Sequence, residues 1–212
     1  MRKMTPIIFI VDDDAKFRKS LERLVKSIGY DVETFASAQK FLQRRIYEGP
    51  SCLLLDVRMP GITGPDLQAK LSKREVPSPI IFLTAHMDMH TGVKAMKDGA
   101  IDFLLKPVEE HALFEMIDKA LDKNAQLIKE QNETKRIKQL FAALTPRELV
   151  VFRWVITGML NKNIALESKI TERTVKAHRS KIMQKLNVSS VAELVRLAQK
   201  VGISPAKDSP QP

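Results

Sequence analysis

The sequence predicts two domains joined by a long helix. The first is an α/β domain of the flavodoxin-like class, with a five-stranded parallel sheet in the order 2-1-3-4-5, and the second is an all-α domain of four short helices. Short apolar runs alternate with amphipathic helical patterns through residues 1–122, residues 108–144 contain neither Gly nor Pro, and helix-start signals recur after residue 144. The 212 residues, 44% of them apolar, are enough for two small hydrophobic cores.

The predicted strands are apolar runs rich in β-branched and aromatic residues, at residues 7–11, 32–35, 52–56, 80–84 and 101–105. Between them, apolar residues recur three and four positions apart, as at Phe17, Leu21 and Leu24. Strands that alternate with helices require right-handed crossovers. The result is a parallel sheet with helices on both faces.

The expected domain plan is a first domain at residues 1–122, a helical connection at 123–143, a second domain at 144–203 and a disordered tail at 204–212. The tail has three prolines in nine residues. The connection is predicted to be one long helix or two nearly continuous ones. Its apolar residues after Leu121 are spaced too irregularly for a strict heptad, which gives a coiled-coil dimer little support.

The net charge of +10 is concentrated toward the C-terminus. Residues 1–122 contain 18 basic and 18 acidic residues, residues 123–144 contain 5 and 2, and residues 145–212 contain 12 and 5. A basic small domain beside a neutral larger one is typical of a protein that binds a polyanion such as nucleic acid.

Other features argue against the membrane and secreted classes. No apolar run is as long as a membrane span, and residues 1–10 lead directly into a strand rather than a cleavable signal. We therefore expect a cytoplasmic protein with no membrane partner. The single cysteine, Cys52, excludes an internal disulfide and lies in an apolar run, so we expect a buried, unreactive thiol.

Acidic residues follow two strands that the predicted order makes neighbours. Asp12, Asp13 and Asp14 end the first strand, and Asp56 ends the third. Ligands of open parallel sheets bind beyond the carboxyl ends of the strands, where the strand order reverses, so these carboxylates should converge there. Like charges held together need a cation, and carboxylate oxygens suit Mg²⁺.

Thr84, at the end of the fourth strand, and Lys106, after the fifth, should reach the same edge. An ammonium offsets phosphate charge and a hydroxyl donates to phosphate oxygens, so the edge suits a phosphoryl group beside Mg²⁺. Any one Asp after a strand more often begins a turn or caps a helix. The agreement among all these strand ends favours the site.

Two other polar pairs are interpreted as solvated surface. His86 and His90 have a spacing that metals use, but no further His or Cys accompanies them at this predicted loop-to-helix junction. Arg44 and Arg45 form a short basic pair at a helix end.

Four motifs of the first domain resemble the signatures of the response-regulator receivers of two-component signalling. They are Ile10-Val11-Asp12-Asp13-Asp14, Leu54-Leu55-Asp56-Val57-Arg58-Met59-Pro60-Gly61, Leu83-Thr84-Ala85 and Phe103-Leu104-Leu105-Lys106-Pro107. The resemblance implies that Asp56 is the phosphoacceptor. It also implies that Mg²⁺ is bound by Asp12, Asp13, Asp56 and the backbone carbonyl of Arg58.

The same resemblance assigns roles around the phosphoacceptor. Lys106 would contact the phosphoryl group, and Thr84 and Phe103 would be the switch residues. The Lys106-Pro107 bond becomes a candidate cis peptide.

Capping signals define the four helices of the second domain. Thr145 and Glu148 form a capping box with Pro146 between them, and this helix stops at Gly158. A short helix starts near residue 162, a third runs from the Thr171 cap to Leu186, and a fourth follows the capping box of Ser190 and Glu193.

The third of these helices has two contrasting sides. Its apolar side carries Val175, Ile182, Met183 and Leu186. The opposite side is small and cationic, with Arg173, Lys176, Ala177, Ser180, Lys181 and Gln184. Such a helix fits a DNA major groove, although a solvated surface helix has a similar pattern.

Four segments of the second domain resemble the LuxR-type helix-turn-helix: Leu144-Thr145-Pro146-Arg147-Glu148, Asn161-Lys162-Asn163-Ile164-Ala165, Thr174-Val175-Lys176-Ala177-His178-Arg179 and Ile182-Met183-Gln184-Lys185-Leu186. With the receiver, the chain resembles the FixJ/NarL family of regulators. The expected DNA contacts are Lys162, Thr171, Arg173, Thr174, Lys176, Ala177, Ser180, Lys181 and Lys185.

The chain departs from that family's pattern at three positions. Ser168-Lys169 replaces a usual Leu-Gly, and Val191 stands where Arg is common. A non-Gly residue in a left-handed turn costs about 1 kcal/mol. Ser168 also gives up core burial, so we expect a weakened turn.

These features predict a phosphorylation-dependent transcription regulator rather than an enzyme. A sensor histidine kinase would phosphorylate Asp56, and phosphorylation would promote a homodimer that binds promoter DNA, with RNA polymerase as a further possible partner. Two alternatives stay open. One is a Mg²⁺-dependent phosphohydrolase with an aspartyl nucleophile, although it would lack a glycine-rich phosphate cradle. The other is a receiver whose helical half is a protein or RNA adaptor.

Overall fold

The structure, a computed structural model, describes residues 5–73, 78–85 and 89–206, and only the backbone of residues 89–91. The chain forms two compact units, residues 1–129 and 130–212. Among the described residues, no helix is both long enough and apolar enough to cross a membrane.

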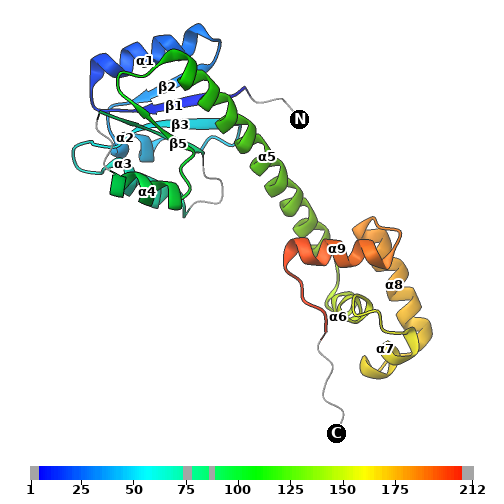
Figure 1. Cartoon of the computed structure of the whole chain (residues 1–212). Helices are drawn as coiled ribbons and strands as arrows, with labels where there is room; N and C mark the ends of the chain where they lie inside the picture. Colours follow the sequence, from blue (N-terminus) through cyan, green and yellow to red (C-terminus); the bar gives the residue numbers. More distant parts are fainter. Residues whose placement is uncertain (1–4, 74–77, 86–88, 207–212) are drawn as a thin grey trace. The chain divides into compact units, whose positions relative to one another are not determined.

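The first unit contains a parallel sheet in the order β2-β1-β3-β4-β5, which confirms the predicted class and strand order (Figure 1). The strands are β1 (Ile7–Val11), β2 (Asp31–Phe35), β3 (Ser51–Asp56), β4 (Ile80–Thr84) and β5 (Asp102–Leu105). The helices are α1 (Ala15–Ser27), α2 (Ala38–Gln43), α3 (Gly64–Leu71), α4 (Met89–Lys97) and the first part of α5 (Glu110–Ala142). Each strand lies within one residue of its predicted bounds.

Successive strand residues face the two layers of helices that cover the sheet (Figure 1). Ile8 and Ile10 of β1 pack in one core with residues of α1 and α5. Phe9 and Val11 pack in a second core with residues of α2, α3 and α4. Every residue of β3 and β4 is buried, as expected for central strands covered on both faces.

A single helix, α5, spans the predicted connection, which confirms the first of the two alternatives for that segment. Near the start of the connection, Asn124 is fully buried and its side-chain oxygen accepts a hydrogen bond from the Ser51 N–H at 2.8 Å. Near its end, Ile137 and Phe141 pack in the core of the second unit. Residues 123–143 are therefore packed at both ends.

The second unit contains the four predicted helices, α6 (Pro146–Val155), α7 (Asn161–Glu167), α8 (Glu172–Leu186) and α9 (Val191–Val201). The side chains of Thr145, Thr171 and Ser190 accept the capping hydrogen bonds expected of them. The apolar side of α8 is confirmed: Val175, Ile182 and Leu186 are buried, and Met183 packs against the same core.

The turn between α7 and α8 has the left-handed backbone conformation that is costly for a residue other than Gly. Lys169 has a φ of 52°, in the left-handed region that favours Gly. After α9, Ala206 donates its N–H to the Arg153 carbonyl at 3.1 Å and packs on the core, so the start of the predicted tail is ordered. The rest of that tail, residues 207–212, lies outside the described residues.

Candidate functional site

Three carboxylates meet at the carboxyl ends of β1 and β3. Asp12 is fully buried, Asp56 is 6% exposed, and Asp13 is exposed. Each offers an oxygen within 4.8 Å of the others. They meet because β1 and β3 are neighbours in parallel register, with Val11 opposite Leu55.

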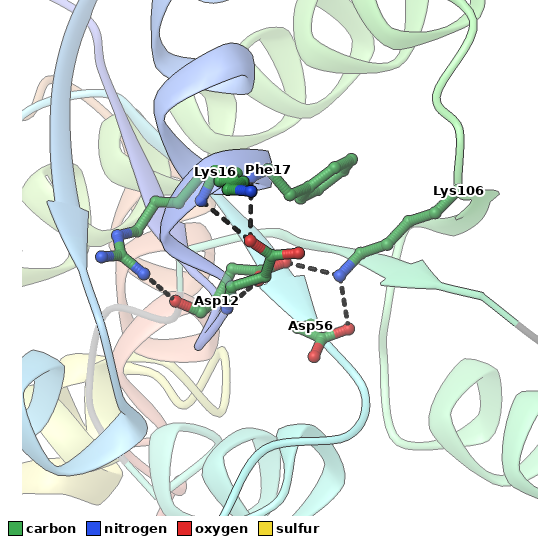
Figure 2. A network of polar contacts seen from close by, with 7 residues as sticks. Asp12, Lys16, Phe17, Asp56 and Lys106 are labelled. Carbon is green, nitrogen blue, oxygen red and sulfur yellow. Dashed lines mark hydrogen bonds and ion pairs between the residues drawn. The ribbon is translucent and has the colours of Figure 1, made fainter.

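The Lys106 ammonium lies between two of these carboxylates. Its Nζ is 2.6 Å from Asp12 Oδ2 and 3.0 Å from Asp56 Oδ1 (Figure 2). It also lies over the Phe17 ring of α1, 4.4 Å from the ring centroid, which adds a cation–π attraction. The Lys106–Pro107 peptide is cis, as anticipated.

Burial and ion pairing shift the pKa values of these groups in opposite directions. Burial raises the pKa of the Asp56 carboxyl, and the hydrogen bond from Lys106 only partly opposes that shift. Burial lowers the pKa of Lys106, but hydrogen bonds to Asp12 and Asp56 outweigh it, so that pKa is raised overall. The ammonium therefore stays charged and compensates the carboxylates.

The surrounding backbone holds the carboxylates in place. Asp14 caps α1, where its side chain accepts the N–H groups of Lys16 at 2.8 Å and Phe17 at 3.1 Å (Figure 2). Those two hydrogen bonds, that of Phe17 first, lower the pKa of Asp14. Arg18 donates to the Asp12 carbonyl at 2.6 Å.

Gly64, at the start of α3, permits a close backbone approach behind the phosphoacceptor candidate. A Cβ at this position would collide with the Asp56 carbonyl oxygen. The Gly64 N–H also donates to the Val57 carbonyl at 3.0 Å. Any larger residue would displace the end of β3.

A cavity of about 190 Å³ opens beside Asp56, lined by Asp56, Arg58, Thr84, Ala85 and Lys106. Thr84 is buried at the end of β4, as the predicted site requires. Phe103 of β5 is half-buried, and its ring stacks on Phe82 with centroids 5.1 Å apart.

Two interpretations of residues away from this edge have different outcomes. Cys52 is fully buried, which confirms the expected burial, and burial raises the pKa of its thiol, which disfavours the reactive thiolate. The prediction that both Arg44 and Arg45 are solvated is wrong for Arg44. Its guanidinium lies 4.0 Å from the Phe9 ring centroid and 4.4 Å from that of Phe41, and only Arg45 is exposed.

His86 and the His90 side chain lie outside the described residues.

The outer side of α8 forms an exposed polar face in the second unit. Its exposed residues are Arg173, Lys176, Ala177, Ser180, Lys181 and Gln184. Lys176 also forms an exposed ion pair with Glu172 at 3.3 Å. Thr171 and Thr174 lie at the start of α8, where the Thr171 oxygen accepts the Thr174 N–H, and Lys162 is exposed on α7.

Lys185 differs from the other predicted DNA contacts because its ammonium pairs with a buried carboxylate. It lies 2.7 Å from Glu148, which is buried, and donates to the Ala143 carbonyl at 3.1 Å. A lysine held in this way supports the start of α6, and its role as a DNA contact stays a prediction. Arg179 is similarly engaged, since it donates to the Asn161 side chain at 2.9 Å.

Comparison with known proteins extends over both units. Residues 8–118 match the response regulator receiver domain, and residues 142–198 match the luxR family of bacterial regulatory proteins. Nodulation protein W of Bradyrhizobium diazoefficiens is 40% identical over 93% of this chain and 87% of that protein. The response regulator TmoT of Ectopseudomonas mendocina is 42% identical over 95% and 91%.

The chain belongs to the response-regulator family, in the group that carries a LuxR-type DNA-binding domain. Solved response regulators have the same architecture. A low-resolution structure of StyR is 47% identical, with a TM-score of 0.81 over 93% of this chain and 100% of that one. Full-length FixJ of B. japonicum is 39% identical, with a TM-score of 0.56 over 93% and 97%. The family regulates transcription and is not an enzyme family, which sets the phosphohydrolase alternative aside.

Several residues that support the site of this response regulator were not identified from the sequence. Phe17 and Arg18 reach Lys106 and the Asp12 carbonyl from α1, and Gly64 supports Asp56 from α3. A short Gly-Pro step in the sequence marks Gly64 as a helix start, but only the packed backbone reveals the close approach. No local pattern marks the aromatic and guanidinium contacts.

Proposed function

We propose that a sensor histidine kinase phosphorylates Asp56 and that the phosphorylated protein binds promoter DNA as a homodimer to control transcription. One observation carries this proposal: three carboxylates and one ammonium converge at the edge of the sheet, with Lys106 at 2.6 Å from Asp12 and 3.0 Å from Asp56. A promoter-binding protein acts where the DNA is, so we place it in the cytoplasm.

The transfer forms one P–O bond and breaks one P–N bond. A carboxylate oxygen of Asp56 attacks phosphorus, and the histidine nitrogen of the kinase leaves with the bonding electron pair. The cavity beside Asp56 gives the phosphoryl group space. Lys106 is close enough to Asp56 to offset the charge of the phosphoryl oxygens.

The donor set at this edge fits Mg²⁺, because it offers hard carboxylate oxygens within 4.8 Å of one another. Asp12, Asp13, Asp56 and the Arg58 carbonyl would hold the ion. When bound, Mg²⁺ neutralises carboxylate and phosphoryl charge. The residues themselves place Asp56 for attack and keep Lys106 beside it.

Phosphorylation adds negative charge and acceptor oxygens next to Thr84, whose hydroxyl can donate to them. We assign Thr84 and Phe103 as the switch residues. Thr84 ends β4 and Phe103 lies on the neighbouring strand β5, paired opposite Phe82. A shift of Thr84 toward the phosphoryl group frees space for the Phe103 ring, which changes the surface formed by α4 and β5.

That surface carries apolar side chains suited to a dimer interface. Val93 and Met96 of α4 and Leu105 of β5 are 52%, 43% and 51% exposed. Large apolar side chains exposed on consecutive elements are typical of interaction surfaces. We propose that phosphorylation stabilises a two-fold dimer through this face.

The outer face of α8 is the proposed DNA reader. Lysines and Arg173 would hold phosphates, while Ala177 and Ser180 permit close approach to base edges. Lys162, Thr171 and Thr174 would add contacts at the start of the helix. A dimer would present two such helices to two half-sites, and RNA polymerase is a further proposed partner.

Substitution of Asp56→Asn tests the phosphoacceptor. The amide cannot act as the attacking carboxylate, so incubation of the purified variant with acetyl phosphate and Mg²⁺ should leave no acid-labile phosphate by intact-protein mass spectrometry. Asp98→Asn, which changes an exposed carboxylate after α4, is the matched control and should be phosphorylated normally. Undiminished phosphate on Asp56→Asn would contradict the assignment.

A further inference from the structure

The contacts described for the Lys106 ammonium join it to two carboxylates and one aromatic ring. Its Nζ lies 2.6 Å from Asp12 Oδ2, 3.0 Å from Asp56 Oδ1 and 4.4 Å from the centroid of the Phe17 ring (Figure 2). Both carboxylates are also proposed ligands of Mg²⁺, and Asp56 would carry the phosphoryl group. Of these three contacts, only that with the ring has no share in binding the metal or the phosphoryl group.

The Phe17 ring is held in place by the start of α1 and by the core of the first unit. Phe17 lies in the first turn of α1, where its N–H donates to Asp14 Oδ1 at 3.1 Å. The side chain is half-buried and packs on the core that also contains residues of α1 and α5. A ring packed in this way has little freedom to change rotamer, so its face stays beside the ammonium.

The Lys106 side chain is also in a position where a ring can restrain it. Its backbone N–H donates to the Thr84 carbonyl at 2.8 Å, which fixes the base of the side chain. The side chain itself is only 18% exposed. The attraction between a cation and a ring face increases as water is removed, whereas the long stem of a lysine is otherwise flexible.

We propose that Phe17 is a positioning residue that keeps the Lys106 ammonium beside the phosphoryl group during its transfer to Asp56. The inference rests on the proposed function of Asp56 as the phosphoacceptor. As Asp56 becomes an acyl phosphate, its carboxylate loses charge and attracts Lys106 less strongly. The ring keeps its attraction, so the ammonium stays where it offsets the charge of the phosphoryl oxygens.

The rate at which acetyl phosphate and Mg²⁺ phosphorylate the full-length protein tests this role, followed by intact-protein mass spectrometry. Phe17→Leu keeps an apolar side chain but removes the ring, and should lower the rate about fivefold. Phe17→Tyr keeps the ring and should restore most of the wild-type rate. Phe114→Leu changes another half-buried ring on the same core, so it is the matched control and should keep the wild-type rate.

Three further measurements separate positioning from packing. One and then three fluorine atoms on the Phe17 ring weaken its negative face with little change of shape, so the rate should fall in that order. In a Lys106→Met background, Phe17→Leu should cause no further loss, because the ring acts through the ammonium. Without Mg²⁺ or phosphodonor, the methylene protons next to the Lys106 ammonium should change their chemical shift in Phe17→Leu, because the ring current is lost.

The outcomes distinguish this inference from the proposed function. Equal rates for Phe17→Leu and Phe17→Tyr, a rate that fluorination leaves unchanged, or a full effect of Phe17→Leu in the Lys106→Met background would overturn the inference alone. A wild-type protein that acetyl phosphate does not label would overturn the proposed function and the inference together. If Phe17→Leu does not fold, the fluorinated proteins decide.

Discussion

Glu148 stabilises the start of α6 and also links α6 to α8. It completes the capping box of α6, where its carboxylate accepts the Thr145 N–H at 2.8 Å, and it pairs with Lys185 of α8 at 2.7 Å. The hydrogen bond from Lys185, followed by the one from Thr145, lowers the pKa of Glu148 to about 2. The ordinary value for the carboxyl is 4.5.

This shift predicts an acid-sensitive second unit. Because the folded pKa of Glu148 is depressed, its stabilisation is present above the unfolded pKa and is lost as the pH falls from about 4.5 toward 2. Lys185 is 34% exposed, so solvent screening reduces the effect, and we expect a loss of about 1–2 kcal/mol between pH 6 and pH 3. Urea unfolding of wild type and Glu148→Gln at both pH values measures it. An equal loss in the variant would contradict the shift.

Lys169 has a left-handed backbone conformation in the turn before α8, so we expect its replacement by Gly to stabilise the protein. Lys169→Gly removes the steric cost of its φ of 52° and should raise the free energy of unfolding by about 1 kcal/mol. Asn187 has the same φ, but Asn tolerates this conformation, so Asn187→Gly is the matched control and should gain less. Thermal unfolding compares the two variants, and a loss of stability in Lys169→Gly would refute the strain.

The candidate site was largely predictable at the residue scale, whereas several supporting contacts were not. Asp56 ends a strand, and Asp12 and Lys106 each follow one, so strand order alone places them at one edge. The partners of Lys185 and Arg44 depend on packing between segments distant in sequence. Side-chain charge by itself suggested a solvated surface for Arg44 and a DNA contact for Lys185.

At the scale of single elements, α8 has two contrasting sides: one packs in the core and the other is polar and exposed. Its apolar side was predictable from spacing because a helical period of 3.6 residues places Val175, Ile182 and Leu186 together. Strands were equally predictable, since their ends coincide with turns and carboxylates. The burial of Asn124 in α5 was not, because its partner, Ser51, begins β3.

The outer side of α8 predicts a specific salt dependence for DNA binding. If Lys181 neutralises one phosphate, Lys181→Ala should weaken binding and reduce the slope of log K against log salt by about one. Lys176→Ala should also weaken binding, although Lys176 already pairs with Glu172. Lys200→Ala on α9, outside this face, is the control and should keep the slope. Fluorescence anisotropy across a salt series gives the slope, and an unchanged slope would remove Lys181 from the backbone contacts.

At the scale of the whole molecule, residues 1–122, which include the receiver domain, carry no net charge, whereas residues 145–212, which include most of the LuxR-type domain, are basic. In the proposed dimer, two DNA-binding domains would make the second half-site contact an intramolecular event, which would raise the apparent affinity without new contacts. Control of dimerisation by the first unit would therefore control DNA binding by the second.

The most direct test of this account is sedimentation of the full-length protein with and without beryllofluoride, a phosphoryl mimic, in the presence of Mg²⁺. A coupling of about 2 kcal/mol should tighten dimerisation roughly thirtyfold, and DNA binding should tighten with it. Thr84→Ala should blunt both responses while leaving Asp56 able to accept phosphate. A monomer–dimer equilibrium that beryllofluoride leaves unchanged, while DNA binding still strengthens, would contradict dimerisation as the switch.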